Sequence, residues 1–375
     1  MAERGWTRQW ALALFVLSAA LLGGCGAEEG AAHKGDGAPE KEPSRQFSSK
    51  LPFRVFAQVE EDQLPKIVGE TPSENPLTIP SRGMWWVEPL GRPDMAAVAK
   101  ELDAQKIPGL QLCRSASDDD LVYLRGSKGL QTLNLSGTQV TNAGMAHLKQ
   151  LKGLQRFTLS DTRVTDAGLA HLKDLKGLRT LNLAETQVTG AGLARLKELK
   201  GLQTLALAST EVKDAGLAHL KDLRGLQELD LDDTEVTDAG LAHLKVLKGL
   251  QRLDLGGTQV TDAGLAHLRG LKGLQRLDLG GTQVTDAGLA HLSELEGLQS
   301  LEFSCTRVTD AGLAHLKDLR ELKSLGLGAT RVTDAGLAHL RELKGLQSLS
   351  LWRTQVTAAG IAELMKSLPH VGTVR

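Results

Sequence analysis

The sequence of 375 residues has few aromatic side chains and almost no net charge. Aromatic residues make up 3% of the chain and include one tyrosine, which leaves few rings for stacking on bases or sugars. Lys and Arg number 44 and Asp and Glu number 45, so the formal charge of −1 gives the whole molecule no attraction to nucleic acid. We therefore expect no nucleic-acid partner, and a polar partner has to be bound by a local patch.

The chain also has few cysteines. Cys25, Cys113 and Cys305 are too few and too scattered for a disulfide framework or a metal-binding knuckle. A catalytic thiol at Cys305 would need a base within about 3 Å, and the nearest histidines in the sequence, His291 and His315, are predicted on helices across the core. We therefore predict that the protein is not an enzyme and that it has no cofactor.

The apolar run at the amino end, residues 11–22, is too short to cross a bilayer of about 30 Å as a helix. It follows Arg4 and Arg8 and ends at Gly23-Gly24-Cys25, which is the layout of a secretory signal. The stretch Leu22-Gly-Gly-Cys25 also resembles the lipobox of bacterial lipoproteins, in which the cysteine becomes the lipidated first residue. This resemblance implies that residues 1–24 are a signal peptide and that Cys25 carries the membrane anchor. The alternative is simple secretion with an incidental cysteine.

Residues 25–50 are mostly Gly, Ala, Pro and charged residues, and they lack the apolar surface that folding needs. We predict a flexible tether. In the sorting rule of lipoproteins, an Asp after the cysteine retains the protein at the inner membrane. Gly26 therefore suggests a lipid-anchored protein of the bacterial cell envelope, on the periplasmic or surface side of the outer membrane.

The strongest pattern is a repeat: residues 130–369 divide into ten units of 24 residues with no insertion or deletion. One unit, residues 274–297, reads LQRLDLGGTQVTDAGLAHLSELEG. Leucines at Leu274, Leu277 and Leu279 indicate a short strand, and Leu289 and Leu292 belong to an apolar stripe on a short helix. Each unit is therefore a strand, a turn and a helix.

Polar residues and glycines mark the ends of each predicted element. Thr285 and Asp286 stand where a helix N-cap accepts the first free amides. Gly297 and its counterparts stand where a left-handed residue would end the helix. Thr282 and its counterparts in the other units form a ladder whose hydroxyls should bond backbone groups in the turn after each strand.

The spacing of the leucines resembles that of the leucine-rich repeat family, L-x-x-L-x-L-x-x-N/C-x-L, with Thr in the Asn/Cys place. The start of the helix, VTDAGL, resembles the ribonuclease-inhibitor subclass and threonine-containing bacterial relatives. The resemblance implies an α/β solenoid, a curved horseshoe with a parallel sheet on its concave face and helices on its convex face. It also implies recognition of another protein, and we expect a monomer.

The repeats need a cap at each end because a single unit cannot bury its own apolar face. Residues 93–129 are predicted to form the amino cap, with a helix near residues 94–105, a degenerate strand at 107–112 and a shortened helix at 118–129. Residues 361–368 close the last helix, and the carboxyl end at 370–375 can add an edge strand. Residues 51–92 are predicted to form only a small irregular region packed on the amino cap.

Eight of the ten histidines fall at one repeat position: His147, His171, His219, His243, His267, His291, His315 and His339. Such a column could bind Zn²⁺, Ni²⁺ or Cu²⁺, or sense pH, in a structural or metal-binding envelope protein. However, no Cys or carboxylate recurs beside it, and Arg195 interrupts it. We favour a surface residue copied by duplication and predict no metal site.

The repeats differ most at strand positions that face the concave side, so specificity is expected there. The middle units place acidic residues at these positions, flanked by arginines and, near the carboxyl end, by an aromatic ring. The predicted surface comprises Glu228, Asp230, Asp232, Asp254, Asp278 and Glu302, with Arg156, Arg252, Arg276 and Trp352. This surface has three interpretations. It is a solvated sheet face, a docking surface for a basic protein or peptide, or a calcium site. The sequence lacks a loop with alternating oxygen ligands, which argues against calcium. Docking of a protein or peptide is the functional interpretation that we prefer.

Overall fold

The computed structural model describes residues 44–59 and 64–374. The predicted signal peptide, residues 1–24, and the predicted lipidation site Cys25 lie outside the described residues. Within the described ranges, no helix combines the length and the apolar character that crossing a membrane requires.

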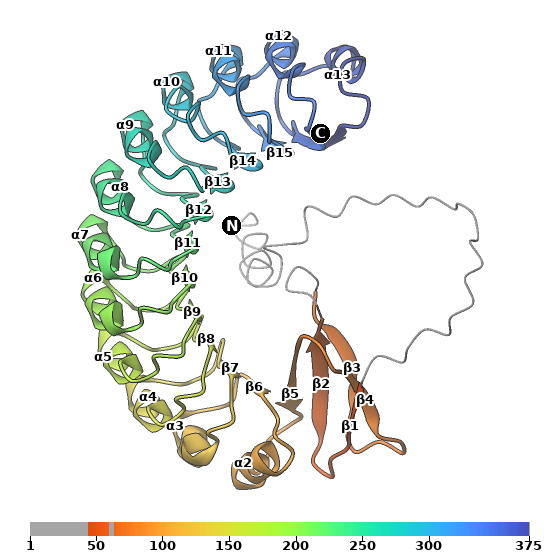
Figure 1. Cartoon of the computed structure of the whole chain (residues 1–375), viewed down its shortest axis with the longest axis vertical. Helices are drawn as coiled ribbons and strands as arrows, with labels where there is room; N and C mark the ends of the chain where they lie inside the picture. Colours follow the sequence, from red (N-terminus) through yellow and green to blue (C-terminus); the bar gives the residue numbers. More distant parts are fainter. Residues whose placement is uncertain (1–43, 60–63, 375) are drawn as a thin grey trace.

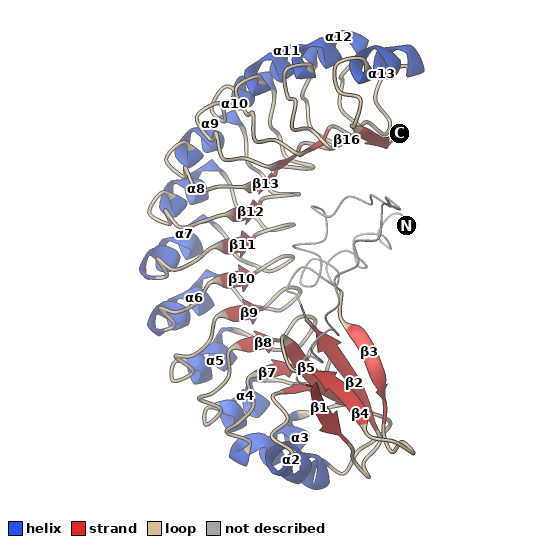
Figure 2. Cartoon of the chain, turned by 45° about the vertical axis from the view of Figure 1, so that its right-hand side comes forward, coloured by secondary structure: helices blue, strands red, loops and turns tan. Residues whose placement is uncertain are grey.

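The chain forms a curved solenoid with a sheet along its inner arc and helices along its outer arc (Figures 1 and 2). This arrangement confirms the predicted horseshoe. From β6 onward all strands are parallel, and each pairs with the strand of the next repeat. The strands are β6 (Gly109–Gln111), β7 (Thr132–Asn134), β8 (Arg156–Thr158), β9 (Thr180–Asn182), β10 (Thr204–Ala206), β11 (Glu228–Asp230), β12 (Arg252–Asp254), β13 (Arg276–Asp278), β14 (Ser300–Glu302), β15 (Ser324–Gly326), β16 (Ser348–Ser350) and β17 (Gly372–Val374).

The helices are short because each repeat allows only one or two turns before the chain returns to the sheet. They are α2 (Met95–Ala104), α3 (Asp118–Leu121), α4 (Asn142–Leu148), α5 (Asp166–Leu169), α6 (Gly190–Leu193), α7 (Asp214–Leu217), α8 (Asp238–Leu244), α9 (Asp262–Leu265), α10 (Asp286–Leu289), α11 (Asp310–Leu313), α12 (Asp334–Leu337) and α13 (Ala358–Met365). Several continue as a 3₁₀ turn, such as η4 (Ala218–Asp222) and η7 (Ala338–Leu340).

The core lies between the sheet and the helices and consists of the repeated aliphatic side chains. Leu277 and Leu279 of one strand segment and Leu289 and Leu292 of the following helix are all buried. Phenylalanine replaces leucine on this face in two repeats, at Phe157 and Phe303, without exposure of the ring. The continuous core therefore runs through all the repeats, and each repeat is buried against its neighbours.

The threonine ladder has the predicted role in the turn after each strand. The Thr282 hydroxyl donates to the Leu279 carbonyl at 2.6 Å, and the same bond recurs in the other units. The residue just before each threonine has a positive φ, for example Gly281 at 68° and Cys305 at 61°. The sharp turn therefore lies at the end of the strand, and the threonine closes it.

The prediction of a left-handed helix cap at Gly297 and its counterparts is wrong. None of these glycines has a positive φ in the described backbone. At some of them the neighbouring repeat passes close by, since a Cβ on Gly153 would lie 2.8 Å from the carbonyl oxygen of Lys128. Glu321 occupies the same repeat position, so a side chain can be accommodated there.

The predicted N-cap is correct for threonine but not for aspartate. The Thr285 hydroxyl accepts the amide of Ala287 at 3.4 Å. The Asp286 carboxylate instead reaches the next repeat, where it accepts the Thr309 amide at 2.7 Å and the Thr309 hydroxyl at 2.6 Å. The same pair of bonds joins most neighbouring repeats, so the VTD motif ties each unit to the next.

One junction replaces both partners of this ladder. Gly190 stands in the aspartate place and Lys213 in the threonine place, so neither side chain of the usual pair is present. The two helix backbones are in close contact here, because a Cβ on Gly216 would lie 2.6 Å from the Cα of Gly190. The junction between α6 and α7 is therefore closed by glycine packing in place of the carboxylate.

Residues 51–92 are not irregular, in contrast to the prediction. They form β2 (Phe53–Gln58), β3 (Lys66–Glu70), β4 (Leu77–Pro80) and β5 (Met84–Pro89), and β5 continues the main sheet by pairing with β6. The stretches FRVFAQ and MWWVEP alternate buried and half-buried residues, as strands with one face in the core do. The last part of the predicted tether is a strand, because β1 (Ser44–Phe47) pairs with β4, and residues 25–43 lie outside the described residues.

The other predicted ends agree with the structure within a few residues. The Asp94 carboxylate caps α2 by accepting the amides of Ala96 and Ala97. The degenerate strand is β6, and the shortened helix is α3 followed by η1 (Val122–Gly126). At the carboxyl end, α13 ends three residues before the predicted helix end, and β17 is the expected edge strand.

We predict that removing one carboxylate of the ladder weakens the junction between two repeats. Asp262→Ala leaves the Thr285 amide and hydroxyl without their acceptor and should lower the free energy of unfolding by about 1–3 kcal/mol. Asp262→Asn is the matched control, because Asn142 already accepts the Thr165 amide and donates to the Thr165 hydroxyl in the native chain. Denaturant unfolding measures the difference. Equal stability of the alanine variant and the native protein would show that the ladder does not stabilise the stack.

Candidate binding surface on the concave sheet

The parallel register arranges the concave side chains in two rows. Each repeat strand buries its middle residue and turns its first and third residues to the concave side. Because Glu228 pairs with Arg252 and Arg252 with Arg276, the first residues follow one another along the arc. Equivalent residues of neighbouring strands are therefore direct neighbours, at the usual strand spacing of about 4.8 Å.

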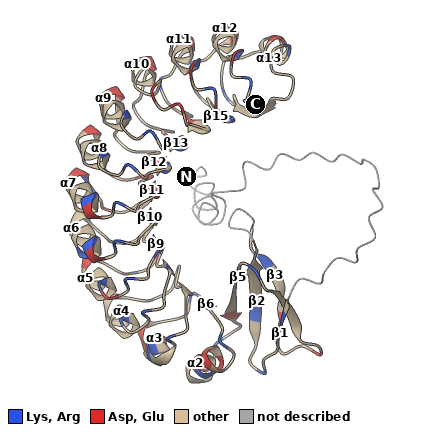
Figure 3. Ribbon diagram, viewed as in Figure 1, with Lys and Arg blue, Asp and Glu red and all other residues tan. Residues whose placement is uncertain are grey.

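The structure brings the predicted acidic residues of the second row together on four consecutive strands. Asp230, Asp254, Asp278 and Glu302 are aligned by the pairing of β11 to β14. Asp232 lies beside this row in the turn after β11, with its carboxylate over Gly256, where a Cβ would lie 2.4 Å from Oδ1. We call these five residues the acidic row. Figure 3 shows the charged residues along the whole arc.

Burial and the proximity of other carboxylates raise the pKa values in the acidic row. Burial, together with neighbouring carboxylates, raises the pKa of Asp254 to about 7 and that of Asp232 to about 7. Burial raises the pKa of Asp230 to about 6. Burial and the charges of Asp254 and Glu302 raise the pKa of Asp278 well above its usual range. The negative charge of the row therefore depends on pH near neutrality.

Each carboxylate also has a local structural contact. Asp254 accepts the amide of Gly256 at 2.9 Å, and Asp278 accepts that of Gly280 at 2.8 Å. The fold does not require this bond, because Ala206 and Gly326 occupy the same position in other repeats. The turns therefore do not require four adjacent acidic side chains on one sheet face.

The predicted arginines do not all belong to this surface. Arg252 lies beside the acidic row and pairs with Glu228, with 2.6 Å between Nη1 and Oε1. Arg276 is its neighbour on β13, and burial and the charge of Arg252 lower its pKa. Arg156 lies three strands away on β8 and contacts Met84, with 2.7 Å between Nη1 and Sδ. Because Arg252 offsets the charge of Glu228 in the first row, the second row is the main source of negative charge on this surface.

Trp352 lies at the carboxyl-terminal end of the surface, after strand β16. Its indole covers Gly328 of the preceding repeat, where a Cβ would lie 1.8 Å from Nε1. The guanidinium of Arg353 is 5.5 Å from the ring centroid. The ring is half-buried, and the Glu302 carboxylate lies over Gly326 of the following repeat in the same way.

An apolar ridge that was not predicted from the sequence lies at the amino-terminal end of the same face. Phe56 pairs with Ile67 on one side and with Trp86 on the other, and the two aromatic rings stack with centroids 5.4 Å apart. Ile67 is 62% exposed. Gly109 continues the row on β6 and makes room for Trp86, since a Cβ there would lie 2.5 Å from the tryptophan Cβ. The alternation of FRVFAQ and MWWVEP was the available signal.

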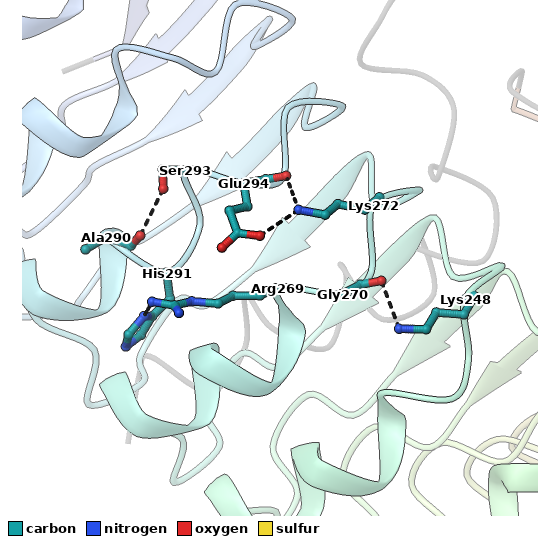
Figure 4. Close-up of polar contacts among 8 residues, drawn as sticks. All are labelled: Lys248, Arg269, Gly270, Lys272, Ala290, His291, Ser293 and Glu294. Atoms are coloured by element: carbon teal, nitrogen blue, oxygen red, sulfur yellow. Dashed lines mark hydrogen bonds and ion pairs between the residues drawn. The ribbon is translucent and has the colours of Figure 1, made fainter.

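The histidine column lies at the ends of the helices, away from the concave sheet. Five of the eight residues are exposed and three, including His147 and His291, are half-buried. Arg269 contacts the Nδ1 atom of His291 in the next repeat (Figure 4), and the Nε atom of Arg125 donates to Nδ1 of His147 at 3.1 Å. Among the residues that the structure describes, no group of three or more His, Cys, Asp or Glu could hold a metal ion.

The two described cysteines are free thiols. Cys305 is exposed, and Cys113 is half-buried beside Ser115, with 3.1 Å between Sγ and Oγ. Cys305 occupies the left-handed position of its turn, on the strand side of the solenoid, whereas His291 and His315 belong to the helical side. The geometry of Cys305 is that of a turn residue.

Comparison with known proteins agrees with this architecture. A family model described as leucine-rich repeat matches residues 128–148, 250–268 and 274–293. The fold is similar to that of an internalin, InlF, from Listeria monocytogenes, with a TM-score of 0.50 and 20% identity, covering 74% of this chain and 92% of that one. A chain of the mouse RP105/MD-1 complex matches with a TM-score of 0.53 and 19% identity, covering 70% of this chain and 45% of that one. No curated protein matches the sequence.

We predict that the acidic row makes the protein less stable as the pH rises. The folded carboxyls bind protons more tightly than unfolded ones, since the pKa of Asp254 is about 7 against an ordinary 3.8. The folded state therefore holds more protons between about pH 4 and 7, and stability falls through that window. Asp254→Asn with Asp278→Asn should flatten the fall and raise stability at pH 8 by about 1–3 kcal/mol.

Thermal unfolding at a series of pH values tests this slope. Asp174→Asn, at an exposed residue outside the acidic row, is the control and should unfold like the native protein at each pH. A native protein whose stability increases steadily from pH 5 to 8 would contradict the raised pKa values.

Proposed function

We propose that this leucine-rich repeat solenoid binds a basic protein or peptide on its concave sheet and has no catalytic activity. The observation that carries the proposal is the acidic row, which places Asp230, Asp254, Asp278 and Glu302 side by side on four strands. A parallel array of this kind complements a partner segment that presents several Lys or Arg side chains. The proposed partner is therefore defined by its charge.

The neighbouring residues add features that protein interfaces commonly use. Trp352 supplies a half-buried aromatic ring at one end of the row, and Arg252 and Arg276 supply donors at its side. Aromatic and arginine side chains are the residues that most often dominate binding energy at interfaces. The chain of the mouse RP105/MD-1 complex with the same fold is itself part of a protein complex, which is consistent with this use of the scaffold.

The uniform repeats support a binding role over catalysis. An enzyme on this frame would need a loop or an extra domain to enclose its substrate, and the ten units have equal length. The thiol of Cys305 is an exposed turn residue. The fold itself serves many functions, so the proposal depends on the surface and not on the architecture.

The proposed location is the bacterial cell envelope, with Cys25 as the lipid-bearing residue. Its support is the sequence alone: two arginines, an apolar run and Leu22-Gly-Gly-Cys25 in the order of a lipoprotein signal. The proposal further places the protein at the outer membrane because Gly26, and not aspartate, follows the cysteine.

We expect neutralisation of the acidic row to abolish partner binding. In the test variant, Asp230, Asp232, Asp254 and Asp278 are all changed to Asn. The change preserves the turn bond of Asp230, Asp254 and Asp278, because Asn134 and Asn182 make it at the same position in native repeats. The control changes Asp174, Asp222, Asp318 and Glu342 to the corresponding amides, at exposed residues outside the row. Pulldown from envelope extract with the full chain compares the basic proteins recovered by each variant.

A partner that binds through the row should be lost from the test variant and kept by the control. Its affinity for the native protein should rise between pH 6 and 8, because the pKa values of Asp232 and Asp254 are about 7. Added salt should weaken binding. Equal recovery of the same partners by the test variant would reject the concave acidic row as the binding surface.

The anchor has a separate test. Cys25→Ser should remove fatty-acyl label from the protein and release it from membranes that are washed with concentrated salt, whereas Cys113→Ser should leave both unchanged. Detection of the label on the Cys25→Ser protein would show that this residue is not the site of lipidation.

A further inference from the structure

Positive charge is concentrated on one edge of the solenoid. We define the basic edge as positions 20 to 24 of each 24-residue unit, where the chain leaves the helix and returns to the sheet. Over the ten units these positions hold 17 Lys and Arg against 8 Asp and Glu, although the whole chain has a net charge of −1. Lys245 and Lys248 are the two cations of the unit that begins at Leu226.

The cations of the basic edge are directed to solvent. Lys173, Lys176, Lys197 and Lys200, from two adjacent units, are all exposed. At the opposite edge, where the helices begin, the recurring carboxylates are half-buried and bonded to the next repeat, as Asp238 is to Thr261.

Local structure explains only part of this charge. In every unit except the one that begins at Leu274, one cation follows the end of a helix, where it is favourable beside the free carbonyl groups, as for Lys173 and Lys245. Some of the second set bond the next repeat, since Lys272 donates to the Glu294 carbonyl at 3.1 Å and Lys248 to the Gly270 carbonyl at 3.0 Å (Figure 4). Lys272 also forms an ion pair with the Glu294 carboxylate, with 2.8 Å between Nζ and Oε2. These contacts do not require two cations in nearly every unit.

The basic edge follows the curve of the repeats along the arc. The units have equal length, so no inserted loop rises from the edge between one repeat and the next. Figure 1 is viewed down the shortest axis and shows the arc in the plane of the picture. One edge of the solenoid therefore faces the viewer and the other faces away. A flat anionic partner can touch many units at once, whereas a linear polyanion would have to bend along the arc.

We infer that the basic edge is a docking surface for an anionic lipid bilayer, which it contacts through lipid phosphate groups. The inference does not depend on the acidic row or on Cys25. A protein that lies on a membrane by this edge keeps its concave sheet open to the side, so both surfaces can be used together. Attraction of this kind grows with the number of cations near the membrane and decreases with ionic strength.

Sedimentation with vesicles tests the inference. The probes are vesicles of phosphatidylcholine mixed with phosphatidylglycerol and vesicles of phosphatidylcholine alone. The full chain carries Cys25→Ser in every case, so that no attached lipid contributes, and any apolar contribution of residues 11–22 is the same for all variants. The test variant changes Lys173, Lys176, Lys197 and Lys200 to Glu. The control changes Lys50, Lys66, Arg82 and Lys100, exposed cations outside the basic edge, to Glu.

The parent chain should bind the anionic vesicles more strongly than the neutral ones. Each cation near the surface contributes about a fivefold increase in partitioning, so the test variant should lose at least about 100-fold of it, and the control should keep it. A second test variant with Lys→Gln at the same four positions removes charge without reversing it and should show a smaller loss. Thermal unfolding confirms that each variant is folded.

Three outcomes would overturn the inference. The first is equal binding to both kinds of vesicle, which would mean that apolar contacts dominate. The second is an equal loss in the test variant and the control, which would mean that only total charge matters. The third is retention on heparin or duplex DNA without binding to anionic vesicles, which would assign the basic edge to a soluble polyanion.

Discussion

The contact between neighbouring repeats is the interaction on which the rest of this structure depends. A unit of 24 residues has one buried leucine face and cannot cover it alone, so every unit is completed by the next. The Asp286 carboxylate, bonded to both the amide and the hydroxyl of Thr309, adds a polar tie at the same junction. Because this tie and the leucine packing recur with one period, the strands align in register along the whole arc.

The regular stack has a direct consequence for function: it turns a sequence period into continuous surfaces. A residue type that recurs at a concave strand position becomes a row of neighbours, as Asp254 and Asp278 show. A residue type that recurs after the helix becomes an edge, as the lysines near positions 20 and 23 show. The proposed partner and the proposed membrane contact therefore use different sides of one scaffold, and neither needs a pocket.

The two surfaces differ in how far the scaffold alone explains them. The cations beside the helix ends have a local electrostatic reason, and duplication copies them from unit to unit. The acidic residues of the concave sheet are not copied throughout, since Ala206 and Gly326 stand in the same row. Burial, together with neighbouring carboxylates, raises their pKa values, an unfavourable arrangement that the fold does not require. This local variation is the better evidence for a specific function.

The sequence by itself determined the period, the strand and helix of each unit, and the turn threonines. It also determined the concave position of Asp230, Asp254 and Asp278. The reason is that the leucine spacing fixes which side of each strand is buried, and parallel pairing then aligns equivalent residues. Only the tertiary structure decided that aspartate of the VTD motif bonds the next repeat, that Arg156 lies away from the acidic row, and that residues 51–92 extend the sheet with Phe56 and Trp86 on its concave face. These features depend on contacts between segments far apart in the chain, for which a local pattern carries no information. The histidines follow the same logic: their column is visible in the sequence, but the arginine that contacts His291 comes from the preceding repeat.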